Sequence, residues 1–180
     1  MQPIAFKPIG IIRTPYTDPE KTPIQGCFAG DSRGRVEVDP EFGLGLKDLE
    51  GFSHLWLIYC FHRAEGYDLL AKPFLDKDKK GIFATRYCKR PNAIGMSAVR
   101  LVGIKDGVLE VAGVDMLDGT PLLDIKPYVS RFDIREGACD GWFARASEWK
   151  KYEEGSQLSA VGNQQSEFGT GSGKDNTPGN

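Results

Sequence analysis

The sequence predicts a mostly β fold, in which a single antiparallel β-barrel is followed by a short C-terminal helix and a disordered tail. Several short segments are rich in β-branched and aromatic residues, tight turns separate them, and hardly any segment shows helical periodicity. Such strands close readily into barrels, which leave no sheet edge unpaired. The length of 180 residues fits one domain with a tail. We expect the barrel over 1–135, a C-terminal extension with helical character over 136–154 and the disordered tail over 155–180.

The first strand is expected over residues 6–13, where isoleucines lie close together, and Thr14-Pro15-Tyr16 ends it. Residues 17–34 are rich in Pro, Asp, Gly and Thr and predict an extended loop. Loops of this length inside a compact domain are usually functional or mobile. A second strand alternates polar and apolar residues over 35–38, and Asp39-Pro40 ends it.

The middle of the chain predicts a helical turn over 44–49 and then the longest apolar run, 54–61. Because residues 55–61 are almost continuously apolar, we expect a strand buried on both faces. A shorter β-rich run covers 82–85, before a polar loop begins.

The next two strands, 97–104 and 108–116, flank Lys105-Asp106-Gly107, which has the composition of a hairpin turn. A further strand is expected over 122–125. Beyond Ser130 the character changes, and residues 143–154 predict a short helix. The stretch 155–180 is rich in Gly, Ser, Asn and Gln, with few apolar residues, which is typical of disorder.

The polar loop after residue 85 carries donors that a core connection does not need. Arg86, Arg90 and Asn92 offer forked or planar donors suited to an anionic or planar partner. Pro91 fixes its φ angle, and Gly95 permits a positive φ or the close approach of a ligand. An ordinary solvated loop between two strands has the same composition, so the residues alone leave both interpretations open.

The net charge of −2 shows no overall basic character, so any surface for nucleic acid must be local. The window 72–90 has a surplus of about five positive charges, seven against two. The charges are Lys72, Lys77, Lys79, Lys80, Arg86, Lys89 and Arg90 against Asp76 and Asp78. A solvated lysine-rich loop is the alternative interpretation.

The remaining composition argues for a cytoplasmic protein without a metal. No run approaches the ~20 apolar residues that span a bilayer, and the N-terminus lacks the pattern of a secretory signal. The four cysteines are widely spaced, which argues against zinc fingers and disulfide scaffolds and suits a reducing compartment. Two histidines without clustered ligand spacing argue against a structural metal.

Several motifs occur in one order over residues 5–130 and together resemble a known family. They are IGIIRTPY (9–16), GFSHLW (51–56), FATR (83–86), RPNAIGMS (90–97), DGTP (118–121) and DIKPY (124–128). The chain resembles the TrmO (YaeB-like, TsaA-like domain) family of S-adenosylmethionine-dependent tRNA methyltransferases. The same resemblance implies a β-barrel, although no Gly-x-Gly-x-x-Gly motif of the usual doubly wound donor-binding fold is present.

The resemblance implies methyl transfer from S-adenosyl-L-methionine to N6 of the threonylcarbamoyl-adenosine at position 37 of tRNA. The implied partner is the tRNA anticodon stem-loop, and the implied assembly is a homodimer with the donor pocket near the subunit interface. Two alternatives stay open: a methyltransferase of the same fold that acts on another RNA or a small molecule, and a non-enzymatic barrel that binds an adenosyl ligand.

The donor site implied by the resemblance has several segments. Its expected residues are Pro23, Ile24, Gln25, His62, Arg63, Arg86, Met96, Met116, Leu117, Asp118, Gly119, Thr120 and Pro121. Arg86 is expected at the carboxylate or ribose end of the donor, and 116–121 at its adenine. Ile24 stands where the family commonly has arginine, which puts side-chain contacts there in doubt and leaves backbone contacts intact.

The acceptor side requires a hydrogen-bond acceptor near the adenine nitrogen, because that nitrogen is a poor nucleophile. Asp115, Asp118 and Asp124 are the acidic candidates, and we expect Asp118 to be catalytic. Asn92 and Arg90 are expected to act with it by holding the acceptor base or its threonylcarbamoyl group.

Overall fold

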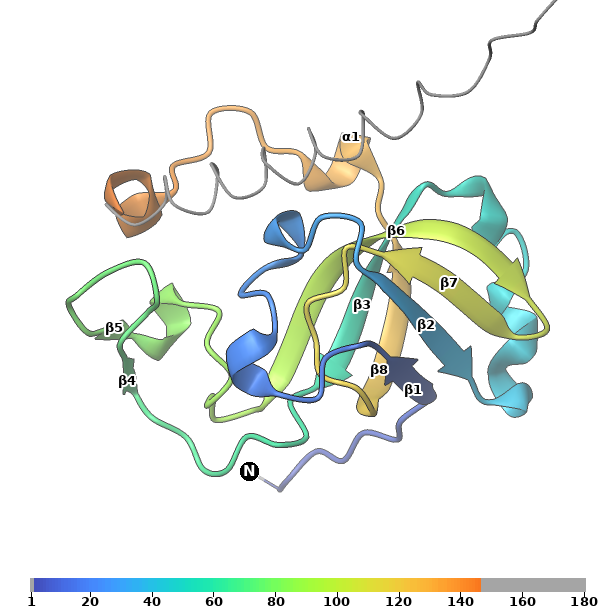
Figure 1. Ribbon diagram of the computed structural model, residues 1–180, viewed down its shortest axis with the longest axis horizontal. Coiled ribbons are helices and arrows are strands. Elements are labelled where there is room, and N and C mark those ends of the chain that lie inside the picture. Colours follow the sequence, from blue (N-terminus) through green and yellow to red (C-terminus); the bar gives the residue numbers. More distant parts are fainter. Residues whose placement is uncertain (1, 147–180) are drawn as a thin grey trace, which may run out of the picture.

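The computed structural model describes residues 2–146, and its centre is a closed antiparallel β-barrel (Figure 1). The six strands pair in the order β1-β2-β7-β6-β3-β8, and β8 closes the ring on β1. They are β1 (Gly10–Arg13), β2 (Arg33–Val38), β3 (His54–Cys60), β6 (Ile94–Lys105), β7 (Val108–Ala112) and β8 (Thr120–Pro127). The predicted mostly β barrel is therefore confirmed.

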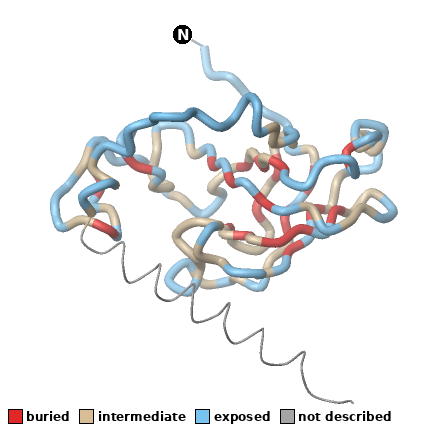
Figure 2. Tube along the Cα trace, turned by 90° about the horizontal axis from the view of Figure 1, so that it is seen from above, coloured by how far each residue is buried: buried red, intermediate tan, exposed pale blue. Residues whose placement is uncertain are grey.

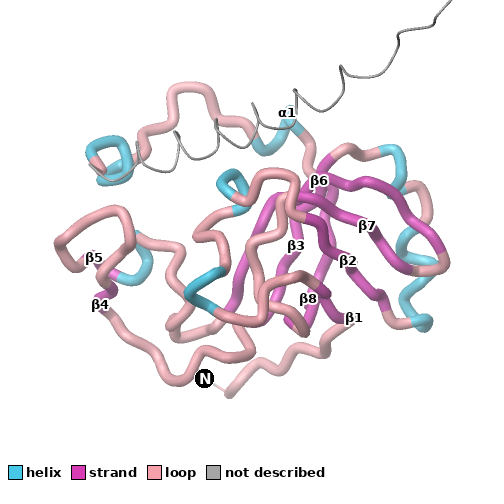
Figure 3. The backbone as a smooth tube through the Cα atoms, in the orientation of Figure 1, coloured by secondary structure: helices cyan, strands magenta, loops and turns pink. Residues whose placement is uncertain are grey.

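Short elements join the barrel strands, and most of the connecting chain is loop (Figure 3). A small two-stranded sheet, β4 with β5, lies outside the barrel. These elements are η1 (Pro19–Lys21), η2 (Gly26–Phe28), η3 (Pro40–Leu46), η4 (Leu49–Gly51), β4 (Leu70–Ala71), β5 (Lys80–Gly81), η5 (Ile82–Ala84), α1 (Ser130–Asp133) and η6 (Gly141–Arg145). All the η elements are 3-10 helices. Neither the small sheet nor α1 was expected from the sequence.

The core fills the barrel, where buried residues from facing strands meet (Figure 2). Ile12, Val36, Leu57, Leu109 and Leu122 are each 0% exposed. The prediction that β3 is buried on both faces is wrong, because its burial alternates and its outward side chains are only half-covered or exposed.

The turn between β6 and β7 confirms the predicted hairpin. Asp106 and Gly107 both have positive φ, 50° and 78°, which is the backbone that a two-residue type I′ turn requires. This turn matches the twist of the two strands. By contrast, β7 ends at Ala112 rather than 116, and Gly113 follows with φ of 79°. The first strand likewise begins at Gly10 rather than residue 6.

The predicted β-run at 82–85 is wrong, because Ile82–Ala84 forms the 3-10 helix η5. The Ile82 carbonyl accepts hydrogen bonds from both the backbone nitrogen (3.1 Å) and the Oγ1 (2.9 Å) of Thr85. Threonine side chains that bond to nearby backbone offer the chain this alternative to a strand. The local turn therefore prevails over the β propensity of the run.

The sequence allowed a positive φ or a ligand at Gly95; its φ is not positive, and the glycine instead makes room for a side chain of the protein itself. It lies on β6 opposite Tyr59 of β3. A Cβ built at Gly95 would lie 2.2 Å from Cε2 of the Tyr59 ring. Glycine is thus required there by packing.

The C-terminal part of the described chain runs outside the barrel. Residues 141–145 form η6, so the predicted helix over 143–154 is a 3-10 helix in its first residues. The rest of that prediction, and the predicted disordered tail over 155–180, lie outside the described residues. Within residues 2–146, no helix has the length and apolar character needed to cross a membrane.

Candidate functional site

A cavity of about 410 Å³ opens between the loop that carries η2 and the outer faces of β3 and β6. Its volume lies in the range of about 300–1,000 Å³ that is typical of ligand pockets. The cavity is lined by Gln25, Gly26, Cys27, Gly30, His54, Trp56, Arg86, Ser97, Ala98, Arg100, Ala112, Gly113 and Asp115. It therefore combines an aromatic wall with two arginines and one aspartate.

Arg86 reaches this cavity from the turn that follows η5. Its Nη1 donates to Oε1 of Gln25 at 2.9 Å, so two residues predicted from separate segments meet here. The Arg86 side chain is otherwise exposed. A guanidinium carries five N–H donors, and one bond to Gln25 leaves its fork available for a carboxylate.

Asp115 supplies the negative charge of the cavity and is mostly covered by the protein. Its Oδ1 accepts a hydrogen bond from Ser97 Oγ at 2.6 Å, and Ser97 Oγ lies 3.0 Å from the hydroxyl oxygen of Tyr59. Burial raises the pKa of Asp115 above its ordinary value, although hydrogen bonds from Ser97 and the Gly26 amide oppose this. Burial and the nearby Asp115 also raise the pKa of Tyr59 well above its ordinary range.

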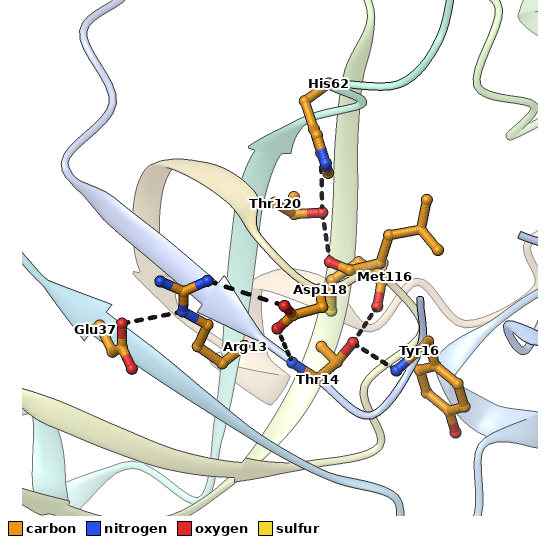
Figure 4. A network of polar contacts seen from close by, with 9 residues as sticks. Arg13, Thr14, Tyr16, Glu37, His62, Met116, Asp118 and Thr120 are labelled. Carbon is orange, nitrogen blue, oxygen red and sulfur yellow. Dashed lines mark hydrogen bonds and ion pairs between the residues drawn. The ribbon is translucent and has the colours of Figure 1, made fainter. Parts of the chain in front are cut away.

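His62 meets the corner at the start of β8, as Figure 4 shows. Its Nδ1 lies 3.4 Å from Thr120 Oγ1, and Thr120 Oγ1 donates to the Leu117 carbonyl at 2.7 Å. Burial lowers the pKa of His62, the Arg63 guanidinium lowers it further, and Asp118 opposes both. The imidazole is therefore held neutral near physiological pH.

Asp118, the predicted catalytic acid, points to a different part of the surface. Its Oδ1 accepts from the Thr14 backbone nitrogen at 3.1 Å, and its Oδ2 lies 3.9 Å from Nη1 of Arg13 (Figure 4). Together with Arg33 and Arg35, these residues line a second, open hollow of about 780 Å³. The structure thus divides the predicted site residues between two hollows, with Asp115 in the first and Asp118 in the second.

The rest of the segment 116–121 mainly builds the corner. Met116 is buried in the core, and its carbonyl accepts from Thr14 Oγ1 at 2.8 Å. Gly119 has φ of 75°, which turns the chain, and its nitrogen donates to the Ile12 carbonyl. Pro121 lies on β8 opposite Ile11.

Two predicted acceptor residues lie on the loop between η5 and β6. The Nη1 of Arg90 donates to the carbonyls of Ile82 (3.2 Å) and Thr85 (2.8 Å), so its guanidinium holds the turn. Asn92 is exposed, and its carbonyl accepts from the Ile94 nitrogen at 2.7 Å. Arg90 is thus a structural group in this arrangement, whereas Asn92 keeps its side chain on the surface.

Other predicted donor-site residues, Met96, Arg63, Pro23 and Ile24, do not line the cavity. Met96 is 49% exposed on the outer face of β6. Arg63 donates through Nη1 to the Thr17 carbonyl at 2.9 Å and so fixes the long loop before η2. Pro23 and Ile24 are half-buried in that loop, and the Ile24 carbonyl accepts from Gln25 Nε2 at 2.7 Å.

Sequence reasoning missed several residues that line the cavity, above all Ser97, Trp56 and Arg100. Ser97 carried a signal that can be found in hindsight, because it is a hydroxyl at a buried, alternate position of a long apolar strand. Arg100 is partly neutralised by an ion pair with Asp31. Among residues 2–146, no three His, Cys, Asp or Glu side chains gather to hold a metal ion.

The comparisons with known proteins agree on one family. The profile of the tRNA-methyltransferase O N-terminal domain matches residues 11–134. A Pyrococcus abyssi protein named "Probable S-adenosyl-L-methionine-binding protein" is 54% identical over 142 residues, which are 79% of this chain and 77% of that protein. The mouse "tRNA (adenine(37)-N6)-methyltransferase" is 38% identical over 136 residues, 71% of this chain. The chain spans only 31% of the length of that mouse protein.

Solved structures agree with the sequence comparison. The crystal structure of TrmO from Pseudomonas aeruginosa superposes with a TM-score of 0.67 at 41% identity, covering 78% of this chain and 62% of that one. The fold and the sequence are therefore similar over the same barrel. The chain belongs to the family of the tRNA-methyltransferase O N-terminal domain.

Proposed function

We propose that this chain transfers a methyl group from S-adenosyl-L-methionine to N6 of the adenosine at position 37 of tRNA, where the adenosine carries a threonylcarbamoyl group. The supporting observation is one cavity that brings an arginine fork, Arg86, together with a largely buried carboxylate, Asp115. Family membership supplies the reaction class, and the cavity supplies groups that suit it.

The residues that line the cavity fit the chemical parts of the donor. The Arg86 guanidinium suits its carboxylate, because a fork of N–H donors matches two carboxylate oxygens. The Asp115 carboxylate and the face of Trp56 suit a cationic sulfonium, through opposite charge and cation–π attraction. When bound, the donor supplies an activated methyl group. The Ile24 carbonyl accepts from Gln25 Nε2 at 2.7 Å, so the backbone at position 24 holds the glutamine that bonds to Arg86.

On the acceptor side, Asp115 takes up the proton that N6 loses on methylation. The Ser97 hydroxyl donates to Oδ1 at 2.6 Å and fixes the carboxylate orientation. Because burial raises its pKa, the carboxylate is a stronger base than an exposed aspartate. His62 stays neutral beside Thr120 and orders the corner that leads into β8.

The direct test is a transfer assay with donor labelled in its methyl group. We expect label in tRNA that carries the threonylcarbamoyl group and none in the same tRNA transcribed without modifications. Enzymatic digestion and mass spectrometry should locate the added methyl on the adenosine at position 37. Label in unmodified transcripts or in another RNA would contradict the proposed substrate.

A second candidate is a non-enzymatic barrel that binds an adenosyl ligand. It is favoured by the relative from Pyrococcus abyssi, which is named for binding alone. The same assay separates the two functions, since a binding protein takes up the donor without turnover. Stoichiometric donor binding with no labelled RNA or small molecule would support this candidate.

We also propose that the chain forms a homodimer through an apolar lobe beside the turn of Arg86. Around β4, β5 and η5, five large apolar side chains are exposed: Tyr67 (61%), Leu69 (62%), Leu70 (59%), Phe74 (68%) and Phe83 (76%). Figure 1 shows this lobe projecting from the barrel. Leu70 pairs with Gly81, which directly precedes η5, so several of these exposed apolar side chains lie on neighbouring elements, as is typical of an interaction site.

Aspartate at Leu70 and Phe83 together is expected to convert a dimer to a monomer in sedimentation velocity, because two charges would have to be desolvated at the interface. Leu44→Asp is the matched control, since Leu44 is 94% exposed but lies in η3, outside the lobe. An unmodified chain that sediments as a monomer at all concentrations would contradict the dimer.

A further inference from the structure

We propose that Trp142 is a positioning residue, which sets the Arg86 guanidinium at the donor site by holding the turn before it. This inference rests on the proposed role of Arg86 in binding the donor. Trp142 lies beyond the residues 11–134 that match the family, in the short helix η6. It therefore adds to the site a group from outside the barrel domain.

The contact that carries the inference joins η6 to η5. The indole Nε1 of Trp142 donates to the Ala84 carbonyl at 2.7 Å, across 58 residues of sequence. Ala84 ends η5, and Arg86 follows two residues later. A hydrogen bond at this point restrains the peptide units from which the Arg86 side chain leaves the turn.

The neighbouring carbonyls of the same turn are also held by side chains. Arg90 Nη1 donates to the Ile82 carbonyl at 3.2 Å and to the Thr85 carbonyl at 2.8 Å. Trp142 therefore holds one of the two carbonyls between them, that of Ala84, so the turn is bonded both from η6 and from the following loop. Arg86 then extends from a fixed turn to Gln25, 2.9 Å away.

The indole is itself held in place, so its hydrogen bond is directional. Its ring stacks on Phe143 with centroids 3.9 Å apart and planes at 24°. The ammonium of Lys80 lies 5.9 Å from the ring centroid, within reach of a cation–π contact, and also pairs with Asp76 at 2.9 Å. These contacts orient the Nε1–H toward η5.

A double-mutant cycle on donor affinity tests the inference. W142F keeps an aromatic ring but loses the N–H donor, so we expect a 3- to 10-fold higher Kd for S-adenosylmethionine by calorimetry. In an R86A background the same substitution should change the Kd less than twofold, because the residue through which Trp142 acts is gone. The KM for the donor should rise in W142F while kcat stays within twofold.

Each outcome bears on a different claim. Equal effects of W142F with and without Arg86, or no effect in either background, would overturn the positioning role while leaving the proposed donor site intact. An R86A chain with unchanged donor affinity would instead contradict the donor site itself. If W142F does not fold, W142Y serves in its place, because it also keeps an aromatic ring and removes the indole Nε1–H that bonds Ala84. W142Y should show the same loss of effect in the R86A background.

Discussion

Alanine at position 86 is expected to raise the Kd for S-adenosylmethionine about 10- to 100-fold. The Arg86 fork is the group of the cavity best suited to the donor carboxylate, and a hydrogen bond to a charged group contributes about 1.5–3 kcal/mol. Each 1.4 kcal/mol corresponds to a tenfold change in affinity. Isothermal titration calorimetry on the purified full chain measures the effect.

Two further variants test whether the loss of affinity comes from the forked donors of Arg86 or from its charge alone. Lysine at position 86 keeps the charge but loses the fork, so its affinity should lie between those of the native chain and R86A. R131A removes an exposed arginine from α1, outside the cavity, and should bind the donor like the native chain. Equal losses in R86A and R131A would mean that net charge, rather than a defined contact, governs binding.

Asparagine at position 115 is expected to lower kcat by about 10²–10⁴, which is the usual contribution of a positioned general base. The variant keeps nearly the same shape and can still accept the hydrogen bond from Ser97, but it cannot take up a proton. Donor affinity should also fall, because the variant loses the charge that suits the sulfonium, but by less than turnover. Single-turnover methyl transfer, measured beside calorimetry, separates the two quantities.

The matched controls are the other two acidic candidates. Asp124 pairs with Lys126 at 2.8 Å on β8, and D124N should leave turnover near the native value. Asp118 bonds the Thr14 backbone, so D118N should lower stability more than turnover. A larger fall in kcat for D118N than for D115N would return the catalytic role to Asp118.

The pH dependence of the native chain follows from the same carboxylate. Burial raises the pKa of Asp115 in the folded state above its ordinary value of 3.8, so the folded chain binds this proton more tightly than the unfolded chain. The contribution of Asp115 to the free energy of unfolding is therefore greatest below pH 3.8, and it is lost as pH rises through the pKa of the folded state. Turnover should rise over that same window, and D115N should lose both dependences.

Much of the barrel could be predicted from the sequence, because its strands and turns are encoded locally. Asp106-Gly107 supplies the two positive φ angles of a hairpin, and the alternation along β6 sets which side chains face the core. The run 82–85 could not be predicted in the same way. Its conformation depends on bonds from Thr85 and Arg90 to the Ile82 carbonyl, and Arg90 reaches that carbonyl only once the following loop has folded.

The sequence predicted which segments contribute to the candidate site, but not which of their side chains bond to one another. Gln25 and Arg86 were both expected at the donor and do meet. The choice between Asp115 and Asp118 depends on the turn at Gly119 and on the Thr14 backbone, which draws the Asp118 carboxylate to the other hollow. Trp142 carried no sequence signal, because its partner is a backbone carbonyl 58 residues away.

A crystal structure of the chain with S-adenosylhomocysteine, the demethylated donor, tests the central claim most directly. We expect its carboxylate within hydrogen-bond distance of the Arg86 guanidinium and its sulfur facing Asp115 in the 410 Å³ cavity. A ligand bound instead in the hollow of Arg13, Arg33, Arg35 and Asp118, away from Arg86, would contradict it.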